Sequence, residues 1–247
     1  MSRLGDTLRK ALHTAPPAMG FRPVAYTKPH MVLIAALYEA PDESSWLQGA
    51  EAVIFGSGFK SRGLKSLVKT LSVPWGIWLD SATSPTAESA GPDFAIFEPE
   101  KTGLELMSNE SLGKVIVAGA SCESSLLHGL SELPIEAVYL KRTPDDPLTW
   151  LDLMQCRRMA DLAAKPLLVP VAPVTPFEQI RTLWEAGVDG LIVTATAENS
   201  LKNLRREMDT LNPGARRKWL RARPTVPVIA PVLSPDQHED DEEEEPE

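Results

Sequence analysis

The sequence is poor in the residues that most metal and disulfide sites require. It contains two cysteines, Cys122 and Cys156, and four histidines among 247 residues. The cysteines have no CxxC spacing and no paired histidines near them, so neither a zinc site nor a disulfide framework is expected. We therefore predict no metal and no cofactor, and a reducing, cytoplasmic location.

Long apolar runs are also missing. No stretch approaches the roughly 18–20 consecutive apolar residues that a membrane-spanning helix needs. Residues 1–14 (MSRLGDTLRKALHT) carry charges throughout and do not resemble a secretory signal peptide. The sequence therefore predicts a soluble protein with no membrane partner.

The net negative charge comes from one end of the chain. Of its 34 acidic residues, nine lie in residues 236–247, which contain no Lys or Arg. The remaining 25 acidic residues balance the 25 basic ones, so the body gives no electrostatic reason to expect nucleic-acid binding. The composition of residues 236–247 is typical of a disordered tail.

Eight short apolar runs recur along the chain, and polar or helix-like stretches separate them. They are continuously apolar rather than alternating, which is typical of parallel strands covered by helices. Eight is also the number of strands in a closed β/α barrel of this size. The runs are residues 31–37, 52–55, 76–79, 94–97, 115–118, 137–140, 167–171 and 191–193.

The intervening segments support the barrel unevenly. The segments after strands one, three and four are short and rich in Ser, Pro and Gly, so their helices are expected to be short or missing. Residues 3–13 predict an extra helix before the first strand that closes the barrel bottom. An open doubly wound sheet is the main alternative, but the loop after the first strand, YEAPDESS, lacks the glycines of a dinucleotide site. The segments expected to be helical are 62–71, 123–133, 148–164, 176–186 and 198–211.

Three parts are expected along the chain. Residues 1–212 form the β/α barrel, residues 213–235 a basic and Pro-rich extension, and residues 236–247 the disordered acidic tail. Most tryptophans, including Trp150 and Trp184, are expected in the core. Trp219 instead lies among basic residues (RRKWLRAR), where it either packs on the barrel or contacts an anionic partner.

One segment carries a family resemblance. Residues 165–195 read KPLLVPVAPVTPFEQIRTLWEAGVDGLIVTA, and residues 185–190 (EAGVDG) form a turn between a helix and the next strand. This pattern resembles the last two strands of the aldolase-type and ribulose-phosphate-binding (phosphate-binding) β/α barrels. The resemblance implies a barrel that binds a small metabolite, phosphorylated or not, as a lyase or isomerase.

The phosphate motif of that family is degenerate in this sequence. After the seventh strand, where the family has glycines, stand Ala172, Pro173 and Val174. A proline offers no backbone N–H to a phosphate, and the side chains of the others keep the backbone further away. Glu198, after the eighth strand, would repel a phosphate.

Candidate site residues follow the carboxyl ends of the strands, where barrel enzymes place their chemistry. Lys141, at the end of the sixth strand, resembles the Schiff-base lysine of class I aldolases, and Glu98 or Asp80 could transfer protons. Adjacent residues face opposite sides of a strand, so only one of Lys141 and Arg142 can face the barrel mouth. The further candidates for substrate binding are Glu39, Arg142, Thr194 and Thr196.

Simpler explanations compete with each of these roles. Charged residues are common where a strand meets water, and Asp80 and Glu98 either cap their loops or ligate a divalent cation. Cys122 follows the fifth strand, either as an ordinary small thiol or as a reactive one. The alternative function is a non-catalytic barrel that acts as a binding or interaction module. The oligomeric state stays open.

Overall fold

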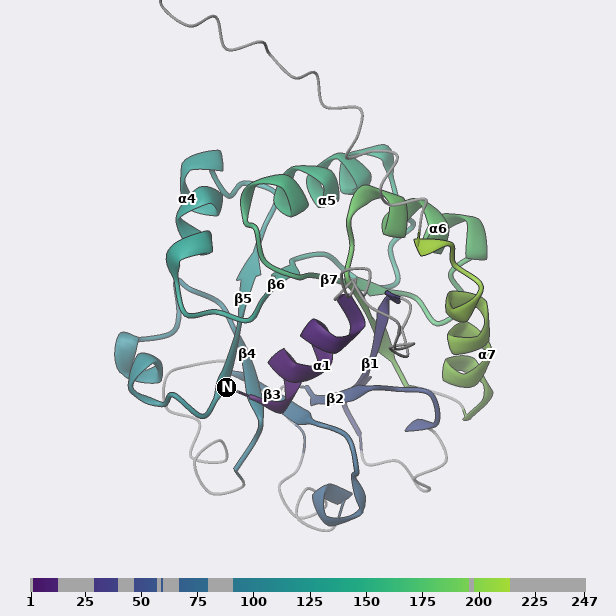
Figure 1. Cartoon of the computed structure of the whole chain (residues 1–247), viewed down its shortest axis with the longest axis horizontal. Helices are drawn as coiled ribbons and strands as arrows, with labels where there is room; N and C mark the ends of the chain where they lie inside the picture. The colour runs from purple at the N-terminus through teal and green to yellow at the C-terminus, as the bar shows by residue number, and fades with distance from the viewer. Residues whose placement is uncertain are drawn as a thin grey trace, which may run out of the picture.

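The structure, a computed structural model, describes residues 2–12, 29–39, 47–56, 59, 67–79, 91–195 and 198–213. Eight parallel strands form a closed barrel in simple sequential order, which confirms the predicted fold class and excludes the open sheet (Figure 1). The strands are β1 Val32–Leu37, β2 Ala52–Phe55, β3 Trp75–Leu79, β4 Phe94–Phe97, β5 Gly113–Ala118, β6 Ala137–Leu140, β7 Leu167–Val171 and β8 Gly190–Thr194.

The barrel closes through β1 and β8, where Val32 pairs with Gly190 and Ala36 with Thr194. A Cβ on Gly190 would lie 2.7 Å from the Leu168 side chain and 3.2 Å from the Val32 carbonyl oxygen. Only glycine therefore allows β8 to pass this closely between its two neighbours.

Side chains alternate between the inside of the barrel and its outer, helix-covered layer. One buried cluster holds Val32, Ile34 and Ala36 of β1 together with the same-facing residues of the other strands. A second cluster holds Leu33, Ala35 and Leu37 with residues of the surrounding helices. Because both faces are buried, the strands are almost entirely apolar; Lys114, near the start of β5, is buried with its ammonium group bonded to the Asn109 and Leu112 carbonyls.

The helix α1 (Arg3–Leu12) closes one end of the barrel, as expected, and lies across its opening in Figure 1. Its Leu4, Leu8 and Ala11 are buried in the interior cluster with the strand residues. At the start of α1, the Ser2 hydroxyl donates a hydrogen bond to Glu136, which directly precedes β6. Apolar side chains of α1 therefore fill the barrel bottom, and the hydrogen bond between Ser2 and Glu136 holds the start of the helix against β6.

Helices and 3-10 turns lie outside the barrel, and the helix after β4 is short, as predicted. Only the 3-10 helix η2 (Leu104–Ser108) follows β4, and residues 67–70 form a helical turn before β3. Most of the segments after β1 and β3 lie outside the described residues. The remaining elements are α4 Ser124–Gly129, η3 Leu130–Glu132, α5 Trp150–Leu162, α6 Phe177–Ala186 and α7 Glu198–Asp209.

The turn after α6 behaves as its sequence predicts. Gly187 ends the helix with φ 105° and ψ 15°, a left-handed conformation that favours glycine. The Val188 N–H donates back to the Leu183 carbonyl at 3.0 Å. The Asp189 carboxylate accepts from the Leu167 N–H at 2.8 Å and so joins the starts of β7 and β8.

One expectation about the helices is wrong. At the start of α6, Pro176 is the N-cap, and the Thr175 hydroxyl donates to the Ala172 carbonyl within the preceding turn. On α5, the buried residues are Cys156 and Met159. The expected core residue Trp150 is instead 81% exposed, so the helix buries a different stripe from the one that its leucines indicate.

Candidate functional site

Two of the predicted catalytic side chains meet at the carboxyl end of the barrel. Glu98 directly follows β4 and continues the inward-facing series of Phe94 and Ile96. Lys141 continues the inward series of Ala137 and Tyr139, and its N–H extends the ladder to the Ala118 carbonyl at 2.9 Å. Although 43 positions apart in the chain, Lys141 Nζ and Glu98 Oε1 lie 3.1 Å apart.

A second lysine completes an ionic cluster around Glu98. Lys101 Nζ lies 2.9 Å from Glu98 Oε2, so each carboxylate oxygen faces one ammonium group. Hydrogen bonds from Lys101 and then Lys141 lower the pKa of Glu98 below its ordinary 4.5, against a smaller effect of desolvation. The carboxylate is therefore ionised at neutral pH, and the cluster of two cations and one anion carries a net positive charge.

The cluster is open to solvent on its lysine side. Both lysine side chains are 59% exposed, whereas Glu98 is 17% exposed. Between β4 and β6, the last inward position of the β5 strand belongs to Gly119, where a Cβ would meet only Ser121 Oγ at 4.0 Å. Among the described residues, both ammonium groups are therefore accessible to solvent.

Aromatic side chains lie below and beside this cluster. Trp78 and Tyr139 are packed edge to face, with ring centroids 5.1 Å apart and planes at 82°. Burial raises the pKa of the Tyr139 hydroxyl, and Tyr38 raises it further. Tyr38 itself is half-exposed at the end of β1 and fills the space beside Gly56. Tyr38 and Tyr139 thus bring phenol groups toward the inner side of the mouth.

Arg142 points away from the mouth, as alternation along the strand requires when Lys141 faces inward. Its guanidinium donates to the Pro170 carbonyl and to the Asp146 carbonyl, both at 2.6 Å. Its Nε lies 3.7 Å from the Asp152 carboxylate without a hydrogen bond. Arg142 therefore joins the loop before α5 to β7, where it also lines a 220 Å³ pocket.

The other predicted ligand-binding residues are distributed unevenly. Thr194 ends β8 on the inward side and is half-buried at the mouth. Glu39 follows the exposed Tyr38 at the end of β1 and lies on the surface. Asp80 and Thr196 lie outside the described residues. The structure therefore brings together Lys141 and Glu98, with Thr194 on the same end of the barrel.

The loop after β7 agrees with the loss of the phosphate glycines. Residues 173–174 form a turn in which the Thr175 N–H and hydroxyl both donate to the Ala172 carbonyl, at 3.1 and 2.7 Å. Those donors are satisfied inside the loop. A ligand anion at this end would therefore depend on the lysines rather than on the backbone of the loop after β7.

Within the described residues, no group of three or more His, Cys, Asp or Glu side chains is placed to hold a metal ion. The same part of the chain has no helix that is both long and apolar enough to cross a membrane.

The two cysteines differ in exposure. Cys122 is half-buried after β5, whereas Cys156 is buried on α5, where burial raises its thiol pKa to about 12.

Sequence reasoning missed two members of the mouth. Lys101 follows Glu98 by three residues, a spacing at which side chains in a turn commonly pair. Tyr139 stands two residues before Lys141 and so shares its inward side. Both spacings can be read from the sequence. They identify members of the site only once the ends of β4 and β6 are known.

These features define the class: the chain is a closed, all-parallel β/α barrel with an ionic cluster at the carboxyl ends of its strands. No protein-family model matches the sequence, and a comparison with curated proteins gives no match. Similar solved structures include tryptophan synthase alpha subunits from the hyperthermophile Pyrococcus furiosus. A mutant alpha subunit has a TM-score of 0.55 at 16% identity, over 74% of this chain and 98% of that chain.

A tryptophan synthase complex from the same organism gives a TM-score of 0.54, again at 16% identity and with the same coverage. At this identity the likeness shows the fold alone. It agrees with the aldolase-type barrel that residues 165–195 predict, and the argument for function depends on the residues at the mouth.

Proposed function

We propose that the barrel mouth binds a small anionic metabolite and that the protein is an enzyme of the lyase or isomerase type. The observation that carries this proposal is the meeting of Lys141 and Glu98 on inward-facing positions of two different strands. Barrel enzymes assemble their sites at this end from residues that are distant in sequence.

The charge of the cluster favours an anion as ligand. Lys101 and Lys141 together exceed the single charge of Glu98, and both ammonium groups are exposed. A phosphate or carboxylate group of the ligand would bridge these two ammonium groups and compensate for the missing backbone donors after β7. The family resemblance implies a phosphorylated metabolite. In this chain the phosphate would be bound by lysines that are not part of the family's glycine motif.

The same groups have complementary chemical roles. Glu98, a carboxylate at neutral pH, would accept a proton from a carbon next to a carbonyl group. Lys141, bound to the anionic group of the ligand, would hold that carbon against Glu98 by electrostatic attraction. Schiff-base formation requires a free, neutral amine, whereas Lys141 Nζ forms an ion pair with Glu98. We therefore assign electrostatic binding of the ligand, rather than a covalent bond, to Lys141.

A non-catalytic interaction module is the second candidate, and one observation favours it. The helix α5 exposes Trp150, Leu151 and Met154 to solvent, each by more than 60%. Such a group of large apolar side chains marks a contact surface more often than it occurs by chance. The two functions lie on different parts of the molecule and are compatible.

A thermal-shift screen of the full chain tests the proposed site. The panel contains inorganic phosphate, sugar phosphates, keto acids, nucleotides and divalent cations. A ligand at about 100 times its Kd adds about 2.7 kcal/mol, which raises the Tm of a domain of this size by about 5–10 °C.

We expect a shift with an anionic compound that disappears in Lys141→Met. The matched control, Lys202→Met, removes an exposed lysine of α7 and should retain the shift. A panel without any anionic hit, or a shift that survives Lys141→Met, would contradict the proposal.

A further inference from the structure

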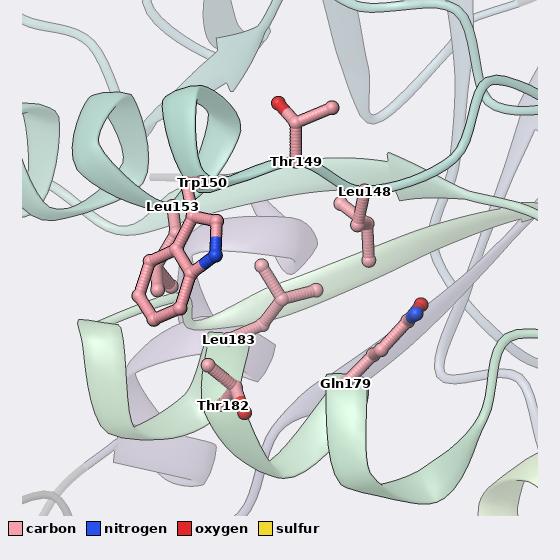
Figure 2. A pocket seen from close by; sticks show the side chains of 7 residues that line it. All are labelled: Leu148, Thr149, Trp150, Leu153, Gln179, Thr182 and Leu183. Carbon is pink, nitrogen blue, oxygen red and sulfur yellow. The ribbon is translucent and has the colours of Figure 1, made fainter.

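A pocket of about 480 Å³ lies between α5 and α6, away from the barrel mouth. Leu148, Leu153 and Leu183 provide its apolar surface, and Trp150 stands at its edge. Figure 2 shows the indole of Trp150 on one side and the amide of Gln179, from α6, on the other. The pocket is therefore a groove bordered by two helices, with polar groups along an apolar floor.

The groove continues onto an exposed apolar surface of α5. Trp150 is 81% exposed, and Leu151 and Met154, which follow it on the same helix, are 62% and 66% exposed. Burial of large apolar side chains is favourable, so three exposed ones on one helix favour contact with a partner segment. The capping box formed by Thr149 and Asp152 fixes the first turn of α5 and presents Trp150 at the surface.

The groove shares two features with sites that bind proline-rich segments, an exposed aromatic ring and nearby hydrogen-bond donors. In such sites apolar side chains of the segment contact the rings, and its exposed backbone carbonyls accept hydrogen bonds. Trp150 supplies a flat ring and an indole N–H. The Gln179 amide, which is exposed on α6, supplies further donors.

We propose that this groove binds the chain's own proline-rich segment, residues 223–235 (RPTVPVIAPVLSP). The segment has four prolines within thirteen residues, at positions 224, 227, 231 and 235, and its other residues are mainly Val, Ile, Leu and Ala. Proline restricts the backbone toward the extended conformation before binding, which reduces the entropy lost on docking. The segment thus supplies the partner that the groove chemistry requires.

The path of the chain places this segment within reach of the groove. The last described residues follow α7, and Trp184 Nε1 of α6 donates to the Asn212 carbonyl at 3.3 Å. The chain therefore leaves the structure in contact with α6, one wall of the groove. Along that helix, Trp184 and Gln179 are separated by about 7–8 Å at 1.5 Å per residue.

The chain between Pro213 and the segment is long enough to reach the groove, and the segment is long enough to fill it. Residues 214–222 span up to about 30 Å when extended, which exceeds the distance along α6. The groove lies beside residues 148–153 and 179–183, which cover about 6–8 Å along the two helices. A polyproline II strand covers that distance with about two or three residues. The centre of the segment, around Pro227 and Pro231, is long enough to fill it.

Cross-linking in the full chain tests the proposal. In a Cys122→Ser background, with Cys156 buried, Ala230→Cys is combined with Thr182→Cys in the groove. The matched control combines Ala230→Cys with Glu207→Cys, an exposed position near the end of α7. Glu207 is closer along the chain to Pro213 than Thr182 is, so an undocked segment would favour the control.

We expect disulfide formation within one molecule to be about tenfold faster with Thr182→Cys than with Glu207→Cys, because docking raises the effective concentration. Adding Trp150→Ala should remove this preference. Equal rates, or a faster control, would overturn the proposal. Cross-linked dimers would overturn it too, since the occupant would then belong to a second copy.

Fluorine NMR gives an independent measurement. With fluorotryptophan incorporated, Trp150→Phe assigns the Trp150 resonance in the full chain. Replacing Val228 and Ile229 by serine should shift that resonance and leave the resonance of Trp78, inside the barrel, unchanged. An unchanged Trp150 resonance would show that the segment does not contact the groove.

Discussion

Replacing Trp184 by alanine should strongly destabilise the barrel. Trp184 is 1% exposed on α6 and packs in the outer apolar layer, where its Nε1 also donates to the Asn212 carbonyl. Truncating a buried tryptophan costs about 3–5 kcal/mol, since the cavity adds to the loss of transfer free energy. For a domain of this size, that corresponds to a fall in Tm of about 6–20 °C.

The chain offers a matched control in Trp150, which begins the neighbouring helix α5. Its side chain is 81% exposed, so Trp150→Ala should change the free energy of unfolding by less than about 1 kcal/mol. Urea unfolding followed by far-UV circular dichroism measures both variants against the unmodified chain. Equal losses in the two variants, or a loss under 1 kcal/mol for Trp184→Ala, would refute the assigned packing.

Three further predictions concern glycine, cysteine and pH. Gly187→Ala should destabilise the protein by about 1 kcal/mol more than Gly91→Ala in urea unfolding. Both glycines have positive φ, but only at Gly187 would a Cβ contact Ala160, at 2.8 Å. At pH 8 a thiol reagent should modify Cys122 in the folded chain and Cys156 only after unfolding, because burial raises the pKa of Cys156 to about 12; rapid modification of both would contradict this. The lowered pKa of Glu98 contributes stability above its ordinary 4.5 that is lost as pH falls through the folded value. The stability difference between the unmodified chain and Glu98→Gln should therefore be larger at pH 7 than at pH 3; a constant difference would count against the ion cluster.

Much of the barrel could be predicted from apolar runs alone. The eight predicted strands match the observed ones to within two residues at each end. This works because strands covered on both faces need apolar residues throughout, so each run marks a strand directly. The closing helix α1 and the left-handed Gly187 also follow from local signals, an amphipathic pattern and a helix-ending glycine.

The surface and the site were harder to predict because their side chains depend on tertiary neighbours. On α5, leucines indicate one buried stripe, but the helix packs through Cys156 and Met159 and exposes Leu151. The sequence placed Lys141 and Glu98 at the same end of the barrel, but it did not predict that their side chains form an ion pair. The contact of Arg142 with the Asp146 carbonyl depends on the path of the following loop, which no periodic pattern indicates.

The most direct test of the central claim is a crystal structure of the full chain with the anionic ligand that gives the largest thermal shift. We predict that its phosphate or carboxylate group lies within hydrogen-bonding distance, about 2.7–3.2 Å, of Lys141 Nζ. Glu98 should then face the carbon skeleton of the ligand. A ligand bound elsewhere, with Lys141 and Glu98 still paired as in the free protein, would contradict the assignment of the barrel mouth as the functional site.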